Sequence, residues 1–349
     1  MNNKRIFWVD AGKVFSIFLI VLGHAMSYND SLRFFNTYMY CFRIPFFFFF
    51  LAMTFSINKY GNFKEFVINK FKTIMIPYFI FALLSYVIFI ILGRFVVESL
   101  DTDNIGPIYK QLIGIFYGNG HDNYLIQNTP LWFLPCLFSA QVMFYFVEKL
   151  KHKNKYLIIL VAAMFLGYLD KKFMPVRLPW GIDIALSMTM FFSFGKMVAA
   201  YIKEESKMKD AVKINLLAII LILIGLMVST FNDRVNTMNN YYGNYILFII
   251  SSFSSIIGYT LLIKQLPNNK IVSYIGKSTM AILVMHKFPI LVFQTIFAST
   301  ANILVNGGAA LALFVSIIVS IISIVMCIMA QRVINKINPK ILGNYSAPS

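Results

Sequence analysis

Long apolar runs dominate the chain, and short polar or charged segments separate them. A helix needs about 20 mostly apolar residues to cross a hydrocarbon layer of roughly 30 Å, and the pattern supplies runs close to this length about ten times. We therefore predict an all-α integral membrane protein with about ten transmembrane helices in one bundle. The expected spans lie near residues 13–28, 37–57, 73–93, 131–149, 156–170, 182–201, 214–231, 244–263, 274–298 and 309–331. An even number of spans with an inside start places both termini in the cytoplasm.

His24 interrupts the first apolar run with an ionisable side chain. Such a group is costly in a hydrophobic span, so it usually faces the protein interior and has a task there. At 100° per residue, His24 lies within roughly 20° of Lys13 and roughly 40° of Asp10 around the helix, and roughly 16 Å deeper than Lys13. The three side chains are expected on one helix face. A histidine that only bonds a backbone carbonyl of a neighbouring helix is the alternative.

Composition supports the membrane class and excludes an ordinary soluble domain. The 349 residues are 59% hydrophobic and 13% charged, against roughly 45–50% and about 25% in soluble proteins. We expect one membrane domain over residues 1–349, without an appended extracytoplasmic domain.

The formal net charge of +17 would suit a nucleic-acid partner until the basic residues are mapped. Under the expected topology, the lysines of segments 58–72, 149–155, 203–213 and 264–277 all face the cytoplasm, which is the positive-inside pattern. The excess is therefore a topology signal, and we expect no nucleic-acid partner. Some of these side chains are alternatively suited to anionic lipid head groups or a phosphate-bearing cofactor.

Three further polar positions lie within apolar stretches. Arg43 keeps its charge, so it needs a carboxylate, carbonyl groups or an anionic ligand, unless it extends to the membrane edge. Trp132 belongs to an aromatic pair between Pro130 and Pro135, and interfacial tryptophan is often only an anchor. His286 is followed by Lys287 deep in the ninth expected span, which favours a polar channel.

Prolines at positions 45, 135 and 289 fall deeper in the expected spans than the other helix-breaking prolines. We expect them to kink helices and to free carbonyl groups that line a cavity.

The sequence lacks the motifs of several common catalytic sites. Cys41, Cys136 and Cys327 show no metal-ligand spacing and are interpreted as core residues, so no metal is expected. There is no nucleophile elbow and no phosphate-cradling glycine loop. An imidazole titrates near neutrality and takes protons from hydroxyl groups, which favours acyl or proton transfer. A transporter that exports a polysaccharide unit or small metabolite is the rival class, because buried histidine, arginine and lysine also suit proton-coupled carriers. A structural subunit of a glycan-assembly complex is a third interpretation.

Five motifs in order resemble those of the acyltransferase family 3 membrane proteins, in particular the fucose 4-O-acetylase-like sugar O-acetyltransferases. They are Trp8–Lys13 with Val21–Ala25, Tyr40–Leu51, Lys72–Tyr78, Pro130–Pro135 and Tyr274–His286. Together they span nearly the whole chain. Two departures occur: Ala52-Met53 replaces a frequent Ser-Gly, and Arg43 stands where many members carry histidine. Loss of the glycine is expected to remove a hinge or a close helix contact.

The resemblance implies a plasma-membrane or inner-membrane enzyme that moves an acyl group, usually acetyl, from acetyl-CoA to a hydroxyl of a cell-envelope carbohydrate or its lipid-linked precursor. It implies the lipid bilayer and a carbohydrate acceptor as partners, with separate glycan-assembly proteins as further candidates. His24 and Arg43 are the expected catalytic residues. His24 would act as a general base or accept the acetyl group covalently. Arg43 would stabilise negative charge on the thioester oxygen or hold the acceptor. Asp10, Lys13 and Lys72 are expected at the CoA, and Trp132 and His286 at the acceptor.

Overall fold

The computed structural model describes residues 6–26, 29–97, 107–174, 176–202, 210–295 and 298–345. Helices account for almost all of its regular structure, and the only β-pairing among these residues is an isolated bridge between Asn236 and Tyr241. The all-α prediction is confirmed.

The α-helices are α1 (Phe7–Ala25), α2 (Arg33–Thr54), α3 (Phe63–Lys70), α4 (Ile76–Val97), α5 (Ile108–Tyr117), α6 (Phe133–Lys149), α7 (Lys155–Phe173), α8 (Ile182–Ile202), α9 (Ala211–Thr230), α10 (Tyr245–Ile263), α11 (Lys270–Lys277), α12 (Thr279–Met285), α13 (Lys287–Thr295), α14 (Ala298–Asn306) and α15 (Ala309–Ile337). Short helical turns are η1 (Asp30–Leu32), η2 (Phe71–Met75), η3 (His121–Asn123), η4 (Ile126–Trp132), η5 (Pro179–Gly181), η6 (Thr237–Asn239) and η7 (Pro339–Leu342).

Within the described residues, eight helices are long and apolar enough to cross a membrane. They are Phe7–Ala25, Asp30–Thr54, Phe63–Ile91, Ile126–Lys149, Pro179–Ala199, Ala211–Thr230, Tyr245–Ile263 and Ala309–Ile337. The expected number was about ten, and the other two expected spans have a different character. Residues 156–170 do form one helix, α7, but its last turn carries Asp170, Lys171 and Lys172. This charged end makes α7 less apolar than the eight.

The ninth expected span, residues 274–298, is not one continuous helix. It is divided among α11, α12 and α13, with breaks at Ser278 and His286. Pro289 contributes to the second break, because a proline has no N–H to donate to the carbonyl four residues earlier, at Met285. Non-helical backbone at membrane depth is tolerated where it is buried in protein or lines a cavity, and His286 is fully buried.

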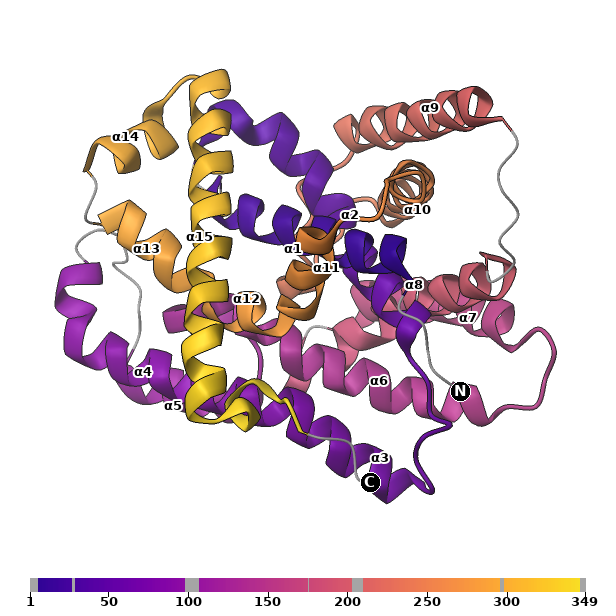
Figure 1. The fold of residues 1–349 in the computed structure, drawn as a ribbon, viewed down its shortest axis with the longest axis horizontal. Coiled ribbons are helices and arrows are strands. Elements are labelled where there is room, and N and C mark those ends of the chain that lie inside the picture. Colours follow the sequence, from indigo (N-terminus) through magenta and orange to yellow (C-terminus); the bar gives the residue numbers. More distant parts are fainter. Residues whose placement is uncertain are drawn as a thin grey trace.

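Helices α1 and α2 lie in the interior of the fold, with α15 crossing on one side and α9 and α10 on the other (Figure 1). Helix α2 contacts α1, α8 and α10. A helix that is surrounded in this way needs apolar side chains on every face, and all five phenylalanines of Phe46–Phe50 are at most 1% exposed. The phenylalanine run is therefore a packing element of the core.

The three prolines expected to kink helices behave differently from one another. Pro45 does lie inside α2, where it leaves the carbonyl of Cys41 without its helical donor. The hydroxyl of Ser252 in α10 donates to that carbonyl at 2.7 Å. Pro135 and Pro289 instead fall in the first turns of α6 and α13, where a missing N–H has little cost. The expected kink is therefore absent at Pro135, because α6 begins later than the apolar pattern suggests, whereas the expected span around Pro289 is indeed interrupted, at His286.

The departure at Ala52 is accompanied by a close helix contact rather than by its loss. Gly195 of α8 lies against the carbonyl of Phe49 and the Cβ atom of Ala52, so close that a side chain on Gly195 would overlap both. The glycine that permits close approach is thus on the partner helix.

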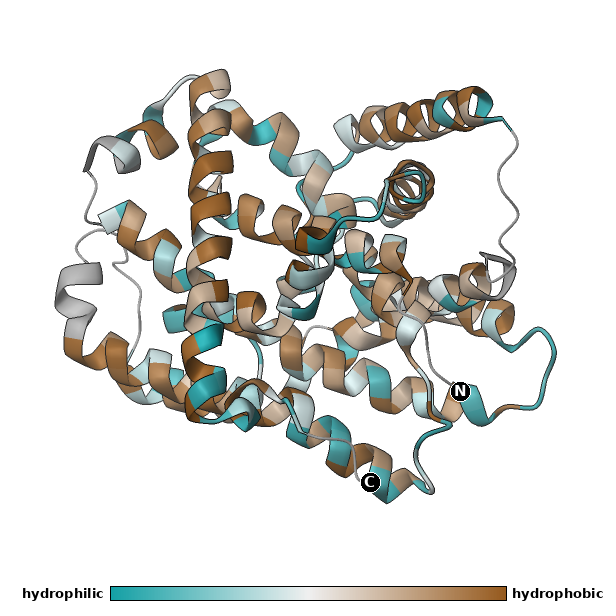
Figure 2. Cartoon of the chain, viewed as in Figure 1, coloured by the Kyte–Doolittle hydropathy of each residue, from teal (hydrophilic) through white to brown (hydrophobic). Residues whose placement is uncertain are grey.

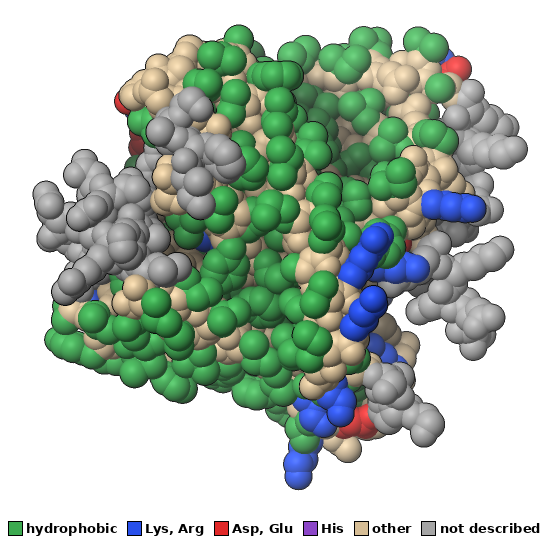
Figure 3. Space-filling view, turned by 60° about the vertical axis from the view of Figure 1, so that its left-hand side comes forward, with side chains coloured by type: hydrophobic (Ala, Val, Ile, Leu, Met, Phe, Trp, Pro, Cys, Tyr) green, Lys and Arg blue, Asp and Glu red, His purple; other side chains and the backbone are tan. Residues whose placement is uncertain are grey.

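The outer surface is largely apolar. Apolar residues cover long stretches of most helices (Figure 2), and a broad apolar face is visible in Figure 3, with lysine and arginine side chains gathered toward one edge. The most apolar 18-residue stretch of α9 has a mean hydropathy of 2.6, and only 11% of that stretch is buried. An apolar surface of this extent, on helices that satisfy their own backbone groups, is suited to lipid. The chain is a multi-pass membrane protein.

The start of α1 and the end of α15 lie at the same end of the fold. Gly276 of α11 packs against Asp10, and Tyr274 of α11 accepts a hydrogen bond from Arg332 of α15 at 3.0 Å. Helix α11 thus joins the first turns of α1 to the last turns of α15.

Candidate functional site

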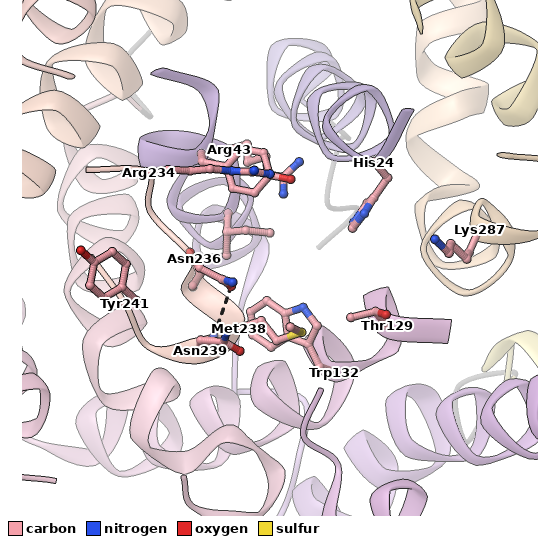
Figure 4. A pocket seen from close by; sticks show the side chains of 13 residues that line it. His24, Arg43, Thr129, Trp132, Arg234, Asn236, Met238, Asn239, Tyr241 and Lys287 are labelled. Atoms are coloured by element: carbon pink, nitrogen blue, oxygen red, sulfur yellow. Dashed lines mark hydrogen bonds between the residues drawn. The ribbon is translucent and has the colours of Figure 1, made fainter. Parts of the chain in front are cut away.

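A cavity of about 670 Å³ lies where the C-terminal end of α1 meets α2, η4, α13 and the α9–α10 connection, residues 231–244. Polar and aromatic side chains from all five segments extend into it (Figure 4). The lining residues are His24, Tyr40, Arg43, Ile44, Thr129, Trp132, Arg234, Asn236, Thr237, Met238, Asn239, Tyr241 and Lys287. This volume is in the range of sites for small organic molecules.

Gly23 explains how Arg43 reaches the cavity past α1. A Cβ atom on Gly23 would overlap the Nη1 atom of Arg43, so only glycine lets the guanidinium lie against this turn of the helix. The last carbonyls of a helix lack intrahelical donors and carry partial negative charge. Tyr40 donates to one of these, the Gly23 carbonyl, at 3.4 Å, and Arg43 Nη1 lies 3.5 Å from the Ile20 carbonyl, about one turn earlier. Arg43 and Tyr40 are thus held at the end of α1.

Two arginines share the ring of Tyr40. The Cζ atom of Arg43 lies 3.6 Å from the ring centroid, and that of Arg234 lies 4.5 Å from it. Cation–π contact orients both guanidinium groups. Arg43 is only 6% exposed, and its Nε atom has no hydrogen-bond partner among the described residues.

His24 forms a pair with a second imidazole. The ring centroids of His24 and His286 are 5.3 Å apart, with an interplanar angle of 40°. Nδ1 of His286 lies 2.8 Å from the Ile282 carbonyl, and because a carbonyl only accepts, Nδ1 carries the proton in this contact. Nε2 of His286 is then an acceptor, and it has no partner among the described side chains and backbone.

Asn128 anchors the η4 segment to two neighbouring helices, α4 and α12. Its amide donates to the Ser85 hydroxyl at 3.0 Å and to the Val284 carbonyl at 3.2 Å. These bonds join η4 to α4 and α12, and they position Thr129 and Trp132 at the cavity.

The α9–α10 connection forms the wall opposite η4 and α13 and is built from asparagine turns. Asn236 and Tyr241 exchange two backbone hydrogen bonds of 2.7 and 3.0 Å. Asn240 adopts a left-handed φ of 53°, which asparagine tolerates better than most residues. The end of α7 holds this segment: the amide of Asn240 donates to Asp170, and Lys171 donates to the Gly243 carbonyl.

The structure brings together some of the predicted site residues and not others. His24, Arg43 and Trp132 line the cavity, and His286 lies directly behind His24. Asp10 and Lys13 do share α1 with His24, but they lie toward its other end.

Lys13 donates to Thr54 at 3.0 Å, and Asp10 packs against Gly276. Lys72 is exposed, with its Nζ atom 6.0 Å from the ring of Tyr345. None of the three predicted CoA-binding residues lines the cavity.

Sequence reasoning missed Arg234, Asn236, Asn239 and Tyr241. A signal was present, because residues 232–244 are rich in asparagine and tyrosine between two strongly apolar helices. Polar residues in a short connection look like solvated loop, and only the fold shows that this one turns inward over the ends of α1 and α2.

The cavity combines a histidine base, fixed cations, hydroxyls and amides. The described residues contain no group of three or more histidine, cysteine, aspartate or glutamate side chains that would hold a metal ion. Cationic donors near a half-buried imidazole suit chemistry in which a hydroxyl loses a proton and negative charge develops on a carbonyl oxygen.

The fold and site define a multi-pass membrane protein with a polar cavity between its helices. Residues 6–329 match the family described as acyltransferase domain. The chain therefore belongs to acyltransferase family 3, as the motif resemblance implied, and it is an acyltransferase. This match favours the enzyme class over the transporter and structural-subunit interpretations. The searches of curated proteins and of solved structures found no match.

Proposed function

We propose that this acyltransferase moves an acetyl group from acetyl-CoA to a hydroxyl of a cell-envelope carbohydrate, or of its lipid-linked precursor, in the plasma or inner membrane. The observation that carries the proposal is His24, half-buried at the end of α1 and facing a cavity whose lining includes three cations, Arg43, Arg234 and Lys287. A hydroxyl acceptor fits this site because a neutral imidazole takes its proton as the oxygen becomes a nucleophile.

In the proposed reaction, Nδ1 or Nε2 of His24 takes the proton of the acceptor hydroxyl, and the oxygen bonds to the thioester carbonyl carbon. The carbon–sulfur bond then breaks, and the proton returns from His24 to the CoA sulfur. Arg43 lies beside His24 with its guanidinium against Gly23, where it stabilises the negative charge on the carbonyl oxygen. Fixed charge directed at a developing oxyanion is commonly the largest catalytic contribution.

His286 and Trp132 are proposed to orient the other participants. His286 is buried directly against His24, and its locked tautomer restricts the hydrogen bonds that the pair makes. Trp132 is 7% exposed and presents its indole to the cavity. A large rigid ring of this kind is suited to pack against an acceptor sugar.

The donor is proposed to enter from the opposite end of α1. Lys13 lies roughly 16 Å from His24 along the helix, and Lys13 and Lys72 belong to the basic end of the fold. Their ammonium groups, with Asp10 beside them, are suited to the phosphates and adenine of acetyl-CoA. The thioester would then reach His24 by passing between the helices of the bundle, along α1.

The test is transfer of labelled acetyl from acetyl-CoA to envelope glycan, in membranes that hold the native chain or His24→Ala at equal abundance. We expect His24→Ala to transfer about 100- to 10,000-fold more slowly, since this is the usual contribution of a general base. His152→Ala is the matched control, because His152 is exposed between α6 and α7.

Equal labelling by native and His24→Ala membranes would exclude His24 from the chemistry. Absence of labelling by both would exclude this donor or acceptor. Labelled His24 recovered in the absence of acceptor would replace the direct route by a covalent acetyl-histidine intermediate.

A further inference from the structure

The cavity lining is cationic without compensation. Arg43, Arg234 and Lys287 line it, and no aspartate or glutamate does. Over the described ranges, none of these three cations forms a salt bridge with a carboxylate. Like charges in a cavity with low-dielectric walls raise its positive potential and attract anions.

Arg43 is the most unusual of the three cations because it is buried and under-bonded. A guanidinium has five N–H donors. Here one face is occupied by Tyr40 at 3.6 Å, the bond to Ile20 is long at 3.5 Å, and Nε is buried without a partner among the described residues. Leaving such donors unpaired is costly. Stacking on Tyr40 fixes the plane of the group and leaves its edge available to a ligand.

Arg234 brings a second guanidinium to the same ring from the α9–α10 connection. Asp233, the preceding residue, forms no salt bridge with Arg234 in the described part of the chain. Its carboxylate instead accepts a hydrogen bond from Tyr241 at 2.9 Å, which raises the pKa of Tyr241. Two cations on one ring repel each other, and an oxyanion bound by both would relieve this repulsion.

We propose that Arg43, Tyr40 and Arg234 form a binding site for an anionic group of the acceptor, a phosphate or a carboxylate carried near the hydroxyl that is acetylated. The inference rests on the proposed function. His24 extends into the space between this arginine pair and Lys287 (Figure 4), so an acceptor held at Arg234 presents its hydroxyl to the base. The acceptor is therefore an acidic sugar or a sugar phosphate rather than a neutral glycan.

The donor is the competing source of phosphate. Arg234 belongs to the connection between α9 and α10, which α7 holds through Asp170 and Lys171. This is the end of the fold at which α1 finishes, whereas Lys13 and Asp10 lie at the end at which α1 begins. The arginine pair is thus far from the basic end proposed for CoA, which favours the acceptor.

The experiment measures binding by the purified full chain in lipid nanodiscs. The probes are methyl glucuronide for the carboxylate, glucose 1-phosphate for the phosphate and methyl glucoside as the neutral sugar. We expect the native protein to bind at least one anionic probe about tenfold or more tightly than the neutral one, because a charge-assisted hydrogen bond supplies at least this much. We expect Arg234→Gln to abolish the preference, Arg234→Lys to retain part of it, and added salt to weaken it.

Arg33→Gln is the matched control, because Arg33 is exposed at the start of α2 and does not line the cavity. Preference for glucose 1-phosphate would identify a lipid-linked sugar phosphate, and preference for the glucuronide an acidic sugar. Equal binding of charged and neutral probes, or an equal loss for all probes in Arg234→Gln, would overturn the inference. Displacement of the anionic probes by adenosine 3′,5′-bisphosphate would overturn it too, by assigning the arginines to CoA.

The same preparations are then assayed for acetyl transfer, which separates the two proposals. Transfer to neutral and anionic acceptors with equal kcat/KM would refute the anion site and leave the acetyltransferase standing. Anion binding that depends on Arg234, without any acetyl transfer, would refute the acetyltransferase.

Discussion

At the scale of single residues, Gly23 is as important to the site as the charged groups beside it. His24 indicates a functional site in the sequence because it is ionisable, whereas a glycine in an apolar helix indicates only a local loss of helix propensity. Its role depends on Arg43, which comes from another helix and occupies the volume where a Cβ atom would lie. A pattern along one helix contains no information about that neighbour. The sequence therefore predicts His24 and Arg43 as separate polar positions, and the fold adds the contact of Arg43 with Gly23, the residue before His24.

We predict that Gly23→Ala reduces acetyl transfer by up to about 100-fold with little loss of folded protein. The new methyl group displaces the end of a flexible side chain rather than backbone, so the fold adapts while the guanidinium moves. A displacement of about 1 Å in a catalytic group is sufficient for an effect of this size. Transfer rates and thermal unfolding of the purified variant are the measurements.

Gly308→Ala is the control, because a Cβ atom there meets nothing within 4 Å. If Gly23→Ala has native transfer rates, Arg43 does not need its observed position.

At the scale of elements, the α9–α10 connection is the least predictable part of the site. The flanking helices follow directly from their apolar runs, and the expected spans 214–231 and 244–263 are close to the observed α9 and α10. The fold of the connection depends on contacts with the end of α7, about 70 residues earlier in the chain. Pro289 predicted a kink in the span 274–298, but the full break at His286 was missed for a similar reason. Its buried neighbours make a non-helical turn acceptable, and apolarity alone does not distinguish a continuous helix from three short ones.

We predict that Asp170 is a positioning residue for this connection. Asp170 is 6% exposed and accepts from Asn240, so Asp170→Ala leaves the amide of Asn240 without its partner, at a cost of about 1–3 kcal/mol. The wall that carries Arg234 then loosens. We expect KM for the acceptor to rise about tenfold while kcat changes less.

Asp170→Asn keeps an oxygen acceptor and should recover most of the affinity. Lys172→Ala is the neighbouring control, since Lys172 is exposed. A tenfold fall in the apparent kcat of Asp170→Ala, with KM unchanged, would contradict the prediction and point to a general loss of folded enzyme.

At the scale of the whole molecule, the polar cavity and the main basic surface lie at opposite ends of the helices. Lys149 ends α6, and the connection from α6 to α7 carries Lys151 and Lys153; this connection is at the far end of α7 from Asp170. Composition and periodicity predicted only that the basic segments share one side, because positive charge marks the cytoplasmic ends of spans, and the placement of that side in the cytoplasm stays a prediction. They did not show that α7 ends in a charged turn or that segment 274–298 is divided among three short helices, which is why the structure has eight long apolar helices rather than ten among its described residues.

We predict that α7 crosses the membrane, with its N-terminal end in the cytoplasm. Cys41, Cys136 and Cys327 are buried, so a cysteine introduced at an exposed position reports on its own side of the membrane. Lys153 is exposed before α7, and Val176 is 62% exposed after it. In intact cells, a membrane-impermeant maleimide should label Val176→Cys and should label Lys153→Cys only after permeabilisation. Since the two positions flank a single helix, labelling of both in intact cells would mean that α7 does not cross. The reversed pattern would place the arginine-lined cavity at the cytoplasmic end and would require acceptor and donor to approach from the opposite sides to those proposed.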